Sequence, residues 1–298
     1  MRKRNYDKFP STQTDGMAIV GWDKIITTLE EQWGEEPVWA IDLYCGTYEE
    51  DVISAFAKTG RKIIDTRTLM RTEEEIRQLT ERFMTDDVLF GYMSNIQLSE
   101  YFDSSKVQEF QKKRDQESCI IIGTGAACFV SENTPLAYAD MARWEIQQRF
   151  RRHEVKALGI DNSQEEPSRQ YKRGYFNDWV ICDRHKDELM QAHRIQYWID
   201  SNNRMMPKMI SDQQFRQGME RTAHKPFRVR RSTTDGVSIV CLKKTAFTWT
   251  STACWWSSPP RMLCSPTAGS CWANKSGPAL ARSFPSASIS STPWGAAI

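Results

Sequence analysis

The first 225 residues alternate segments of strand character with amphipathic helical segments, and this alternation limits the possible folds more than any other feature. The segments 37–46, 61–70 and 119–123 have the pattern of buried strands, whereas 22–33 and 72–83 carry apolar residues at helical spacing. Strands that alternate with helices favour a mainly parallel sheet covered on both faces. The sequence therefore predicts an α/β fold, with helices that flank the sheet, up to about residue 225.

Local signals refine this prediction. Thr72 stands where an N-cap is expected, with Glu75 in the capping-box position three residues later. Residues 84–93 fit either a third strand or an extended loop, and residues 97–117 have a helical pattern. The apolar segment 136–140 predicts a further strand.

Charge and hydropathy exclude several classes of partner. The formal net charge of +2 is too close to neutral to indicate binding to nucleic acid or to an anionic membrane. No apolar run approaches the roughly 20 residues needed to cross a bilayer, and the basic start of the chain is not followed by an apolar signal core. The 8 cysteines lack metal-type CxxC spacing. We therefore expect a cytoplasmic protein with reduced cysteines and no nucleic-acid or membrane partner, while a homo-oligomer stays open.

The amino-acid composition of the chain changes near Arg230. Of the 38 acidic residues, only Asp235 falls in the segment 231–298, where Ser, Thr, Pro, Cys and Trp accumulate without helical or strand periodicity. A low-complexity tail would explain why residues 231–298 have no helical or strand periodicity. The five tryptophans of this segment do not fit that explanation, because disordered segments have few aromatic residues.

A shift of reading frame accounts for this composition. When each codon is read from its last base into the next codon, the residues from Phe284 to Ile298 are compatible with PIRFDFLDTMGGGN, without an imposed stop. The same offset is compatible with a GFHLD-like stretch over 245–250. We therefore predict that residues 229–298 form an aberrant, irregular and disordered tail.

The glycine turn that follows three isoleucines is the first candidate site. Gly123, Thr124, Gly125 and Ala126 lie at the carboxyl end of a predicted parallel strand, where backbone N–H groups can approach an anion. The turn lacks the GK[ST] ending of a Walker A loop and is too short for a dinucleotide fingerprint. On the motif alone a simple tight turn is favoured over a phosphate site.

Charged residues after the next strand favour the phosphate site. Asp140 ends the segment 136–140, where its carboxylate could bind a metal or cap the following helix. Arg143 is the nearest cation to that strand end and is the best candidate for a phosphate fork. Glu145 and Arg149 are spaced as a surface ion pair.

A second charged cluster lies further along the chain. Lys172 and Arg173 precede a glycine and form a basic turn that could meet an anion, and Asp178 and Asp183 could orient such cations. His185 could act as an acid or a base, although a single histidine in a charged run is usually exposed. The 4 histidines show no HxH or HxxxH spacing, so the sequence indicates no zinc site.

Several short pieces, taken together, resemble the long form of the bacterial class I mannose-6-phosphate isomerase family. These pieces are YDKFP, GWDKI, GTGAA, YADMARWEIQQRFR, YKRGYF followed by DW, DRHK, PKMI and KPFRV, spread over residues 5–229. The long form is similar to a kinase-like α/β domain joined to a C-terminal cupin. The offset-frame string PIRFDFLDTMGGGN is similar to the cupin sequence of the same family.

The resemblance implies a parent activity that converts mannose 6-phosphate to fructose 6-phosphate with zinc, by proton transfer between C1 and C2. It places the zinc ligands and the base in the cupin, so no residue of this chain inherits them. It implies that residues 1–228 are the accessory domain, similar to P-loop kinases without a Walker A lysine, and that 229–298 replaces the start of the cupin.

We therefore expect a truncated isomerase homologue that is inactive. Two alternatives stay open: a freestanding module that binds a nucleotide or a sugar phosphate, and a structural domain that supports cupin folding or association.

Overall fold

The computed structural model describes residues 12–114 and 118–224, and the predicted tail 229–298 lies outside them. The described residues belong to two compact units. The larger unit comprises Ala18–Met141 and Glu145–Ser211. The smaller unit contains α8 and two short segments, and each unit is described by itself below.

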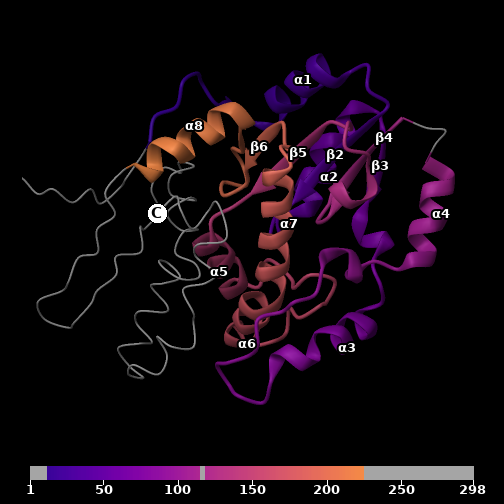
Figure 1. Cartoon of the computed structure of the whole chain (residues 1–298), viewed down its shortest axis with the longest axis vertical. Coiled ribbons are helices and arrows are strands. Elements are labelled where there is room, and N and C mark those ends of the chain that lie inside the picture. The colour runs from indigo at the N-terminus through magenta and orange to yellow at the C-terminus, as the bar shows by residue number, and fades with distance from the viewer. Residues whose placement is uncertain (1–11, 115–117, 225–298) are drawn as a thin grey trace, which may run out of the picture. The chain divides into compact units, whose positions relative to one another are not determined.

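The larger unit contains a seven-stranded mixed sheet with the order β1-β7-β6-β5-β2-β4-β3 (Figure 1). The strands are β1 (Ile19–Val20), β2 (Val38–Leu43), β3 (Lys62–Asp65), β4 (Cys119–Gly123), β5 (Leu136–Asp140), β6 (Tyr197–Asp200) and β7 (Lys208–Ser211). Strands β3, β4, β2, β5 and β6 run parallel, whereas β7 is antiparallel to β6 and β1 is antiparallel to β7. The prediction of a mainly parallel α/β sheet flanked by helices is confirmed.

Helices connect most of the strands. The α-helices are α1 (Trp22–Trp33), α2 (Glu49–Phe56), α3 (Glu73–Met84), α4 (Ser104–Arg114), α5 (Arg143–Arg151), α6 (Pro167–Arg173), α7 (Trp179–Gln191) and α8 (Asp212–Ala223). Short 3-10 turns are η1 (Ala57–Thr59), η2 (Thr66–Leu69), η3 (Leu98–Tyr101) and η4 (Ala126–Phe129), and a π-helical turn, η5 (Gly174–Asp178), joins α6 to α7. Among the described residues, no helix has the length and apolar character to span a bilayer.

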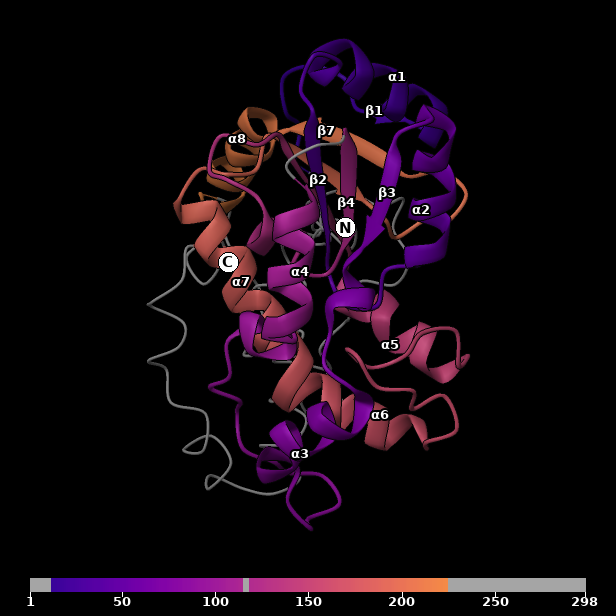
Figure 2. The same ribbon diagram turned by 90° about the vertical axis from the view of Figure 1, so that its right-hand side faces the viewer.

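The hydrophobic core explains why α1 and α2 cover one face of the sheet. Ile25 and Leu29 of α1 are fully buried, as their helical spacing predicts, and Phe56 of α2 joins them. They pack against Ile41 of β2 and Ile122 of β4, whose side chains point to the same face of the sheet. Figure 2 shows α2 on one side of the strands and α7 on the other.

The face toward α7 is polar at one end. Asp42 of β2 and Asp140 of β5 alternate with the apolar residues of the first face and point to the opposite side. Both carboxylates contact side chains of α7. The carboxyl ends of the parallel strands and the buried side of α7 therefore enclose a charged region.

Two local predictions are tested directly by the structure. The capping box is confirmed, because the Thr72 hydroxyl accepts a hydrogen bond from the Glu75 N–H and the Glu75 carboxylate accepts one from the Thr72 N–H. Residues 84–93 contain no strand and form the loop alternative of the prediction.

The prediction of one helix over 97–117 is wrong within its described part. The chain forms η3, becomes extended at Phe102 and begins α4 at Ser104. Phe102 is buried and packs edge-on against Phe129 at 4.7 Å between ring centroids, so its burial interrupts the helix. The Asp103 carboxylate then accepts the backbone N–H of Ser105 at 2.8 Å, which starts a new helix.

The smaller unit is organised by Asp15. The Asp15 N–H donates to Gln217 of α8 at 2.8 Å, and the Asp15 carboxylate pairs with Arg221 one helical turn later at 3.1 Å. Thr12 and Thr222 share a hydrogen bond of 2.9 Å between their hydroxyl groups. These contacts attach the segment that precedes β1 to the side of α8.

Candidate functional site

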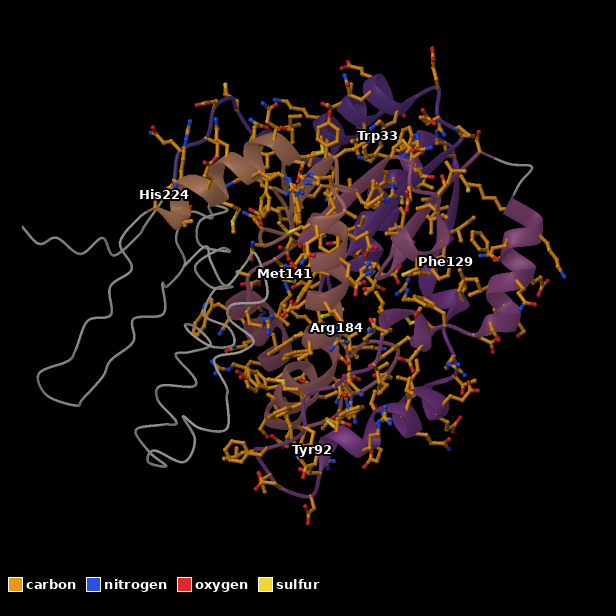
Figure 3. All side chains as sticks on the ribbon, in the orientation of Figure 1. Trp33, Tyr92, Phe129, Met141, Arg184 and His224 are labelled. Carbon is orange, nitrogen blue, oxygen red and sulfur yellow. The ribbon has the colours of Figure 1, made fainter. Side chains whose placement is uncertain are left out.

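The carboxyl edge of the sheet gathers acidic residues from four parallel strands. Asp65, Asp140 and Asp200 are the last residues of β3, β5 and β6, and Asp42 is next to the last residue of β2. Phe129 and Met141, which lie just beyond β4 and β5, mark this edge in Figure 3. Ligands of open α/β sheets bind outside the carboxyl ends of the strands, so this edge is the place to search for a site.

The glycine turn after β4 directs its N–H groups at Asp42. Gly125 donates to Asp42 Oδ1 at 3.0 Å and Ala127 donates to Asp42 Oδ2 at 2.9 Å. Gly123 and Gly125 have φ values of 136° and 81°, which side chains rarely allow. The backbone groups that were predicted to receive a phosphate thus hold a carboxylate of the protein itself.

The same carboxylate binds His185 of α7. His185 Nε2 lies 2.9 Å from Asp42 Oδ2, and both side chains are buried. Burial lowers the pKa of His185, but the charge and the hydrogen bond of Asp42 outweigh it, so the pKa lies above its ordinary value. The expectation that His185 is exposed is wrong. Helical spacing could have predicted its burial, because it shares one face of α7 with Ile181, Cys182 and Leu189.

A buried ion pair lies next to this dyad. Lys186 Nζ lies 3.1 and 3.0 Å from the two carboxylate oxygens of Asp140, and both residues are buried. The ammonium group also lies 4.4 Å from the ring centroid of Tyr44, in a cation–π contact. Burial raises the pKa of Asp140, and Lys186 opposes that rise. Asp140 therefore serves as the counter-ion of Lys186, a residue that sequence analysis did not single out.

Asp183 and Tyr44 connect α7 to the loop after β2. The Tyr44 hydroxyl donates to Asp183 Oδ1 at 2.5 Å. Asp183, which was predicted to orient a cation, accepts this hydrogen bond from a phenol. The loop that follows Tyr44 is thereby attached to α7 one turn before the buried face of His185 and Lys186.

Arg149 donates hydrogen bonds to the loops that follow β2 and β6. It is fully buried, donates to the carbonyl oxygens of Gly46 at 2.8 Å and Ser201 at 2.7 Å, and lies 3.9 Å from the ring centroid of Tyr48. Its nearest approach to the Glu145 carboxylate is 3.4 Å. The predicted pair of Glu145 and Arg149 is present. Its placement at the surface is wrong, because the guanidinium group is fully buried and backbone carbonyls of two loops replace solvent around it.

The predicted basic turn has its partners elsewhere. Lys172 Nζ donates to the carbonyl oxygens of Thr85, at 3.2 Å, and of Asp87, both beyond the end of α3. Arg173 Nη1 donates to the Thr80 hydroxyl of α3 at 3.1 Å. These hydrogen bonds attach α6 to α3 and to the loop that follows it. Arg143, the predicted phosphate fork, is half-buried at the start of α5 and belongs to the smaller unit.

Asp178 lies in the π-helical turn and is buried. It accepts the Leu158 N–H at 3.1 Å, and burial raises its pKa to about 6, although the nearby charge of Arg173 opposes the rise. The hydroxyl of Tyr101 and the Nε of Arg173 are buried in the same region without hydrogen-bond partners. A carboxyl group in this setting changes its charge close to neutral pH.

Glu49 and Arg67 form a further charged pair that sequence analysis missed. Arg67 Nε lies 3.1 Å from Glu49 Oε2 and Arg67 Nη2 lies 2.5 Å from Asp65 Oδ2. Burial raises the pKa of Glu49 to about 7, and the positive charge of Arg67 opposes this. The position of Glu49 in the first turn of the helix after a glycine turn was a usable signal.

The chemistry available at this edge is proton exchange and hydrogen bonding. Because His185 Nε2 donates to Asp42, the second ring nitrogen is the one able to accept a proton, and it makes no hydrogen bond to any residue in the described ranges. No group of three His, Cys, Asp or Glu side chains within residues 12–114 and 118–224 could hold a metal ion.

Comparison with protein-family models matches most of the chain. A family model described as "Domain of unknown function (DUF8485)" matches residues 21–224, which include strands β2 to β7 and the whole carboxyl edge. No curated protein sequence matches the chain. Because the match covers more than half of the 298 residues, the chain belongs to the DUF8485 family.

Proposed function

We propose that the chain is a shortened homologue of the long-form mannose-6-phosphate isomerase, and that its larger unit is an accessory domain with a supporting role. One observation carries the supporting role: the Asp42 carboxylate accepts the N–H groups of Gly125 and Ala127. The anion position of the glycine turn is thereby filled from within the protein. The N–H groups of Gly125 and Ala127 therefore have hydrogen-bond partners without a phosphorylated ligand.

The arrangement of the isomerase-like pieces supports the resemblance. The piece GTGAA follows β4, YAD ends β5, and DRHK lies within α7. Lys186 of DRHK pairs with Asp140 of YAD. GTGAA, through its backbone, and His185 of DRHK both contact Asp42, which lies outside these pieces. Pieces that are far apart in the sequence and adjacent in space fit a shared structural origin better than chance similarity.

Zinc chemistry has no place in the proposed role of this domain. The parent reaction uses zinc to polarise the sugar oxygens while a base moves the proton. The described residues offer no group of three side chains able to hold the ion, so no catalytic step is assigned to them.

An isomerase assay tests the proposal. The full chain, supplied with zinc and mannose 6-phosphate, is expected to form no fructose 6-phosphate above the rate without protein. Substantial turnover would contradict the absence of a catalytic domain.

A second candidate function is the binding of a nucleotide or a sugar phosphate at the same edge. It is favoured by the Thr66 hydroxyl, which is buried beside Gly123 without a hydrogen-bond partner. The adjacent Arg67 and the partly exposed Glu49 could contribute charged groups to such a site. A ligand hydroxyl or phosphate oxygen would satisfy Thr66, which the supporting role leaves unsatisfied.

Titration calorimetry of the full chain with mannose 6-phosphate, ATP and UTP separates the two functions. The supporting role predicts no binding heat with any of the three compounds. The binding role predicts heat that falls strongly in Arg67→Ala. Heat that is unchanged in this variant would remove the proposed phosphate contact.

A further inference from the structure

The loop over residues 85–93, between α3 and η3, exposes four large apolar side chains. The exposed fractions are 78% for Val88, 49% for Leu89, 68% for Tyr92 and 42% for Met93. Tyr92 is labelled in Figure 3 near the end of the ribbon formed by α3. Apolar residues exposed singly are normal, but these four lie close together in the sequence, on one loop, and apolar side chains exposed together indicate an interaction surface.

Hydrogen bonds within this 85–93 loop fix its backbone. Asp87 Oδ1 accepts the N–H groups of Leu89 and Phe90, each at 2.7 Å. The Thr85 hydroxyl donates to the carbonyl of Phe90, across the turn. Thr85 has a φ of 46°, which is strained for a β-branched residue. The turn is thus held in one shape although its tip faces solvent.

Contacts beneath the loop hold it to the domain. The buried Lys172 uses its ammonium group on the carbonyls of Thr85 and Asp87, and Tyr92 donates its N–H to the Phe83 carbonyl at 2.8 Å. A Cβ atom at Gly91 would lie 2.3 Å from that same carbonyl oxygen, so the backbone approach requires glycine. A surface that is already ordered loses little conformational entropy when it binds.

The charges that flank the apolar side chains have both signs. Asp86 precedes Val88 and is exposed. Arg82 stacks over the Phe83 ring at 4.7 Å and reaches the Asn95 side chain at 3.4 Å, so it lies at the other end of the loop. Neither Asp86 nor Arg82 forms an ion pair with another described residue. The loop and the end of α3 therefore expose an acid and a base beside the four apolar side chains in the sequence.

We propose that the 85–93 loop is the contact surface between two copies of this chain related by a two-fold axis. In such a contact the same patch meets itself, so it must be self-complementary. The apolar side chains form the centre, and Arg82 of each copy faces Asp86 of the other at the rim. An anionic membrane is disfavoured as the occupant, because the exposed Asp86 and Asp87 of the loop outnumber Arg82 at its rim.

Sedimentation equilibrium of the full chain tests the proposal. The wild-type chain is expected to dimerise, and Val88→Ser with Tyr92→Ala is expected to weaken dimerisation by about tenfold or more, because each truncation counts twice in a two-fold contact. The matched control is Met205→Ser with Met206→Ser, which truncates side chains that are 81% and 52% exposed away from the loop. The control should dimerise as the wild type does. A monomeric wild type, or equal weakening in the control, overturns the proposal.

A charge exchange tests the pairing at the rim. Arg82→Asp and Asp86→Arg are each expected to weaken the dimer severalfold, because like charges then face each other across the axis. The double variant restores opposite charges and should recover most of the wild-type affinity. Circular dichroism confirms that each variant is folded. A double variant that is no better than the single ones contradicts the two-fold arrangement, even if association itself persists.

Discussion

Asp42 satisfies three donors from two elements, namely the N–H groups of Gly125 and Ala127 and the imidazole of His185. The sequence contained a signal for this role, because Asp42 is a single acid in the otherwise apolar strand VWAIDL, and a buried acid requires partners. The identity of those partners could not be predicted. They lie more than 80 residues away along the chain, and only the packing of α7 and η4 against β2 brings them together.

Replacement of Asp42 tests this role. Asp42→Asn keeps the shape but presents an amide N–H to one of the three donors, so the variant is expected to lose about 3 kcal/mol or more of unfolding free energy. Urea unfolding of the full chain measures the loss. Asp65→Asn is the control at the same edge, where the ion pair is partly exposed and the loss should be about 1 kcal/mol or less. Equal losses of unfolding free energy in the two variants would contradict the role of Asp42 as the acceptor of three buried donors.

The same variant changes the titration of His185. Since the charge and the hydrogen bond of Asp42 hold the pKa of His185 above its ordinary value, Asp42→Asn should lower that pKa. In the wild type the stabilisation from this pair is fully present below the unfolded pKa of about 6.5 and is lost as the pH rises through the folded pKa. Imidazole proton signals in an NMR titration report the shift. An unchanged pKa would show that the two side chains are not coupled in solution.

Asp178 also makes the free energy of unfolding depend on pH, but here burial of the carboxyl group, and not a charged partner, raises the pKa. Its pKa of about 6 lies above the ordinary 3.8, so the folded state holds the proton more tightly than the unfolded chain does. Between pH 4 and pH 6 the wild type should therefore lose about 2 kcal/mol of unfolding free energy relative to Asp178→Asn, which cannot ionise there. Urea unfolding of both proteins at several pH values measures the difference. Parallel pH curves would show that burial does not perturb this carboxyl group.

At the scale of elements, periodicity and capping signals predicted the framework correctly. The apolar stripe of α1 and the capping box of α3 depend on residues three or four apart, and both are present as predicted. The prediction over 97–117 was wrong because Phe102 leaves the helix to pack against Phe129, a contact that local spacing does not encode. Arg149 was placed on the surface for the same reason, since its carbonyl partners come from two distant loops.

Lys172 of α6 holds the backbone of the 85–93 loop through hydrogen bonds to its carbonyl groups. If it supports the 85–93 loop and is not a phosphate ligand, Lys172→Met should leave the carbonyls of Thr85 and Asp87 unsatisfied and speed hydrogen exchange in that loop about tenfold. Exchange in the glycine turn 123–127 should stay as in the wild type.

Hydrogen exchange with mass spectrometry follows both segments in one experiment. Arg169→Met, an exposed substitution in the same helix α6, is the control. Unchanged exchange in the 85–93 loop, or loss of protection confined to the glycine turn, would contradict the support of the loop by Lys172. It would favour Lys172 as a phosphate ligand instead.

At the scale of the whole molecule, the family match and the change in composition divide the chain at nearly the same point. The DUF8485 match ends at residue 224, and the acidic residues all but cease after Arg230. The fold of the larger unit could be predicted because strands and helices alternate within it. The predicted tail 229–298 lies outside the described residues, so the shift of reading frame stays a prediction that rests on codons alone.

Restoring the reading frame tests that prediction. Insertion of one base near codon 229 moves the later codons into the offset frame, where the resemblance places the start of a cupin. The restored protein, extended to the next stop in that frame, is expected to bind zinc after dialysis and to convert mannose 6-phosphate, whereas the original chain is expected to do neither. Metal content and turnover are separate measurements: zinc without turnover would indicate a cupin that still lacks catalytic residues. A restored chain that binds no zinc and keeps the solubility of the original would instead mean that the sequence after residue 229 is its own, and the isomerase descent would lose its strongest support.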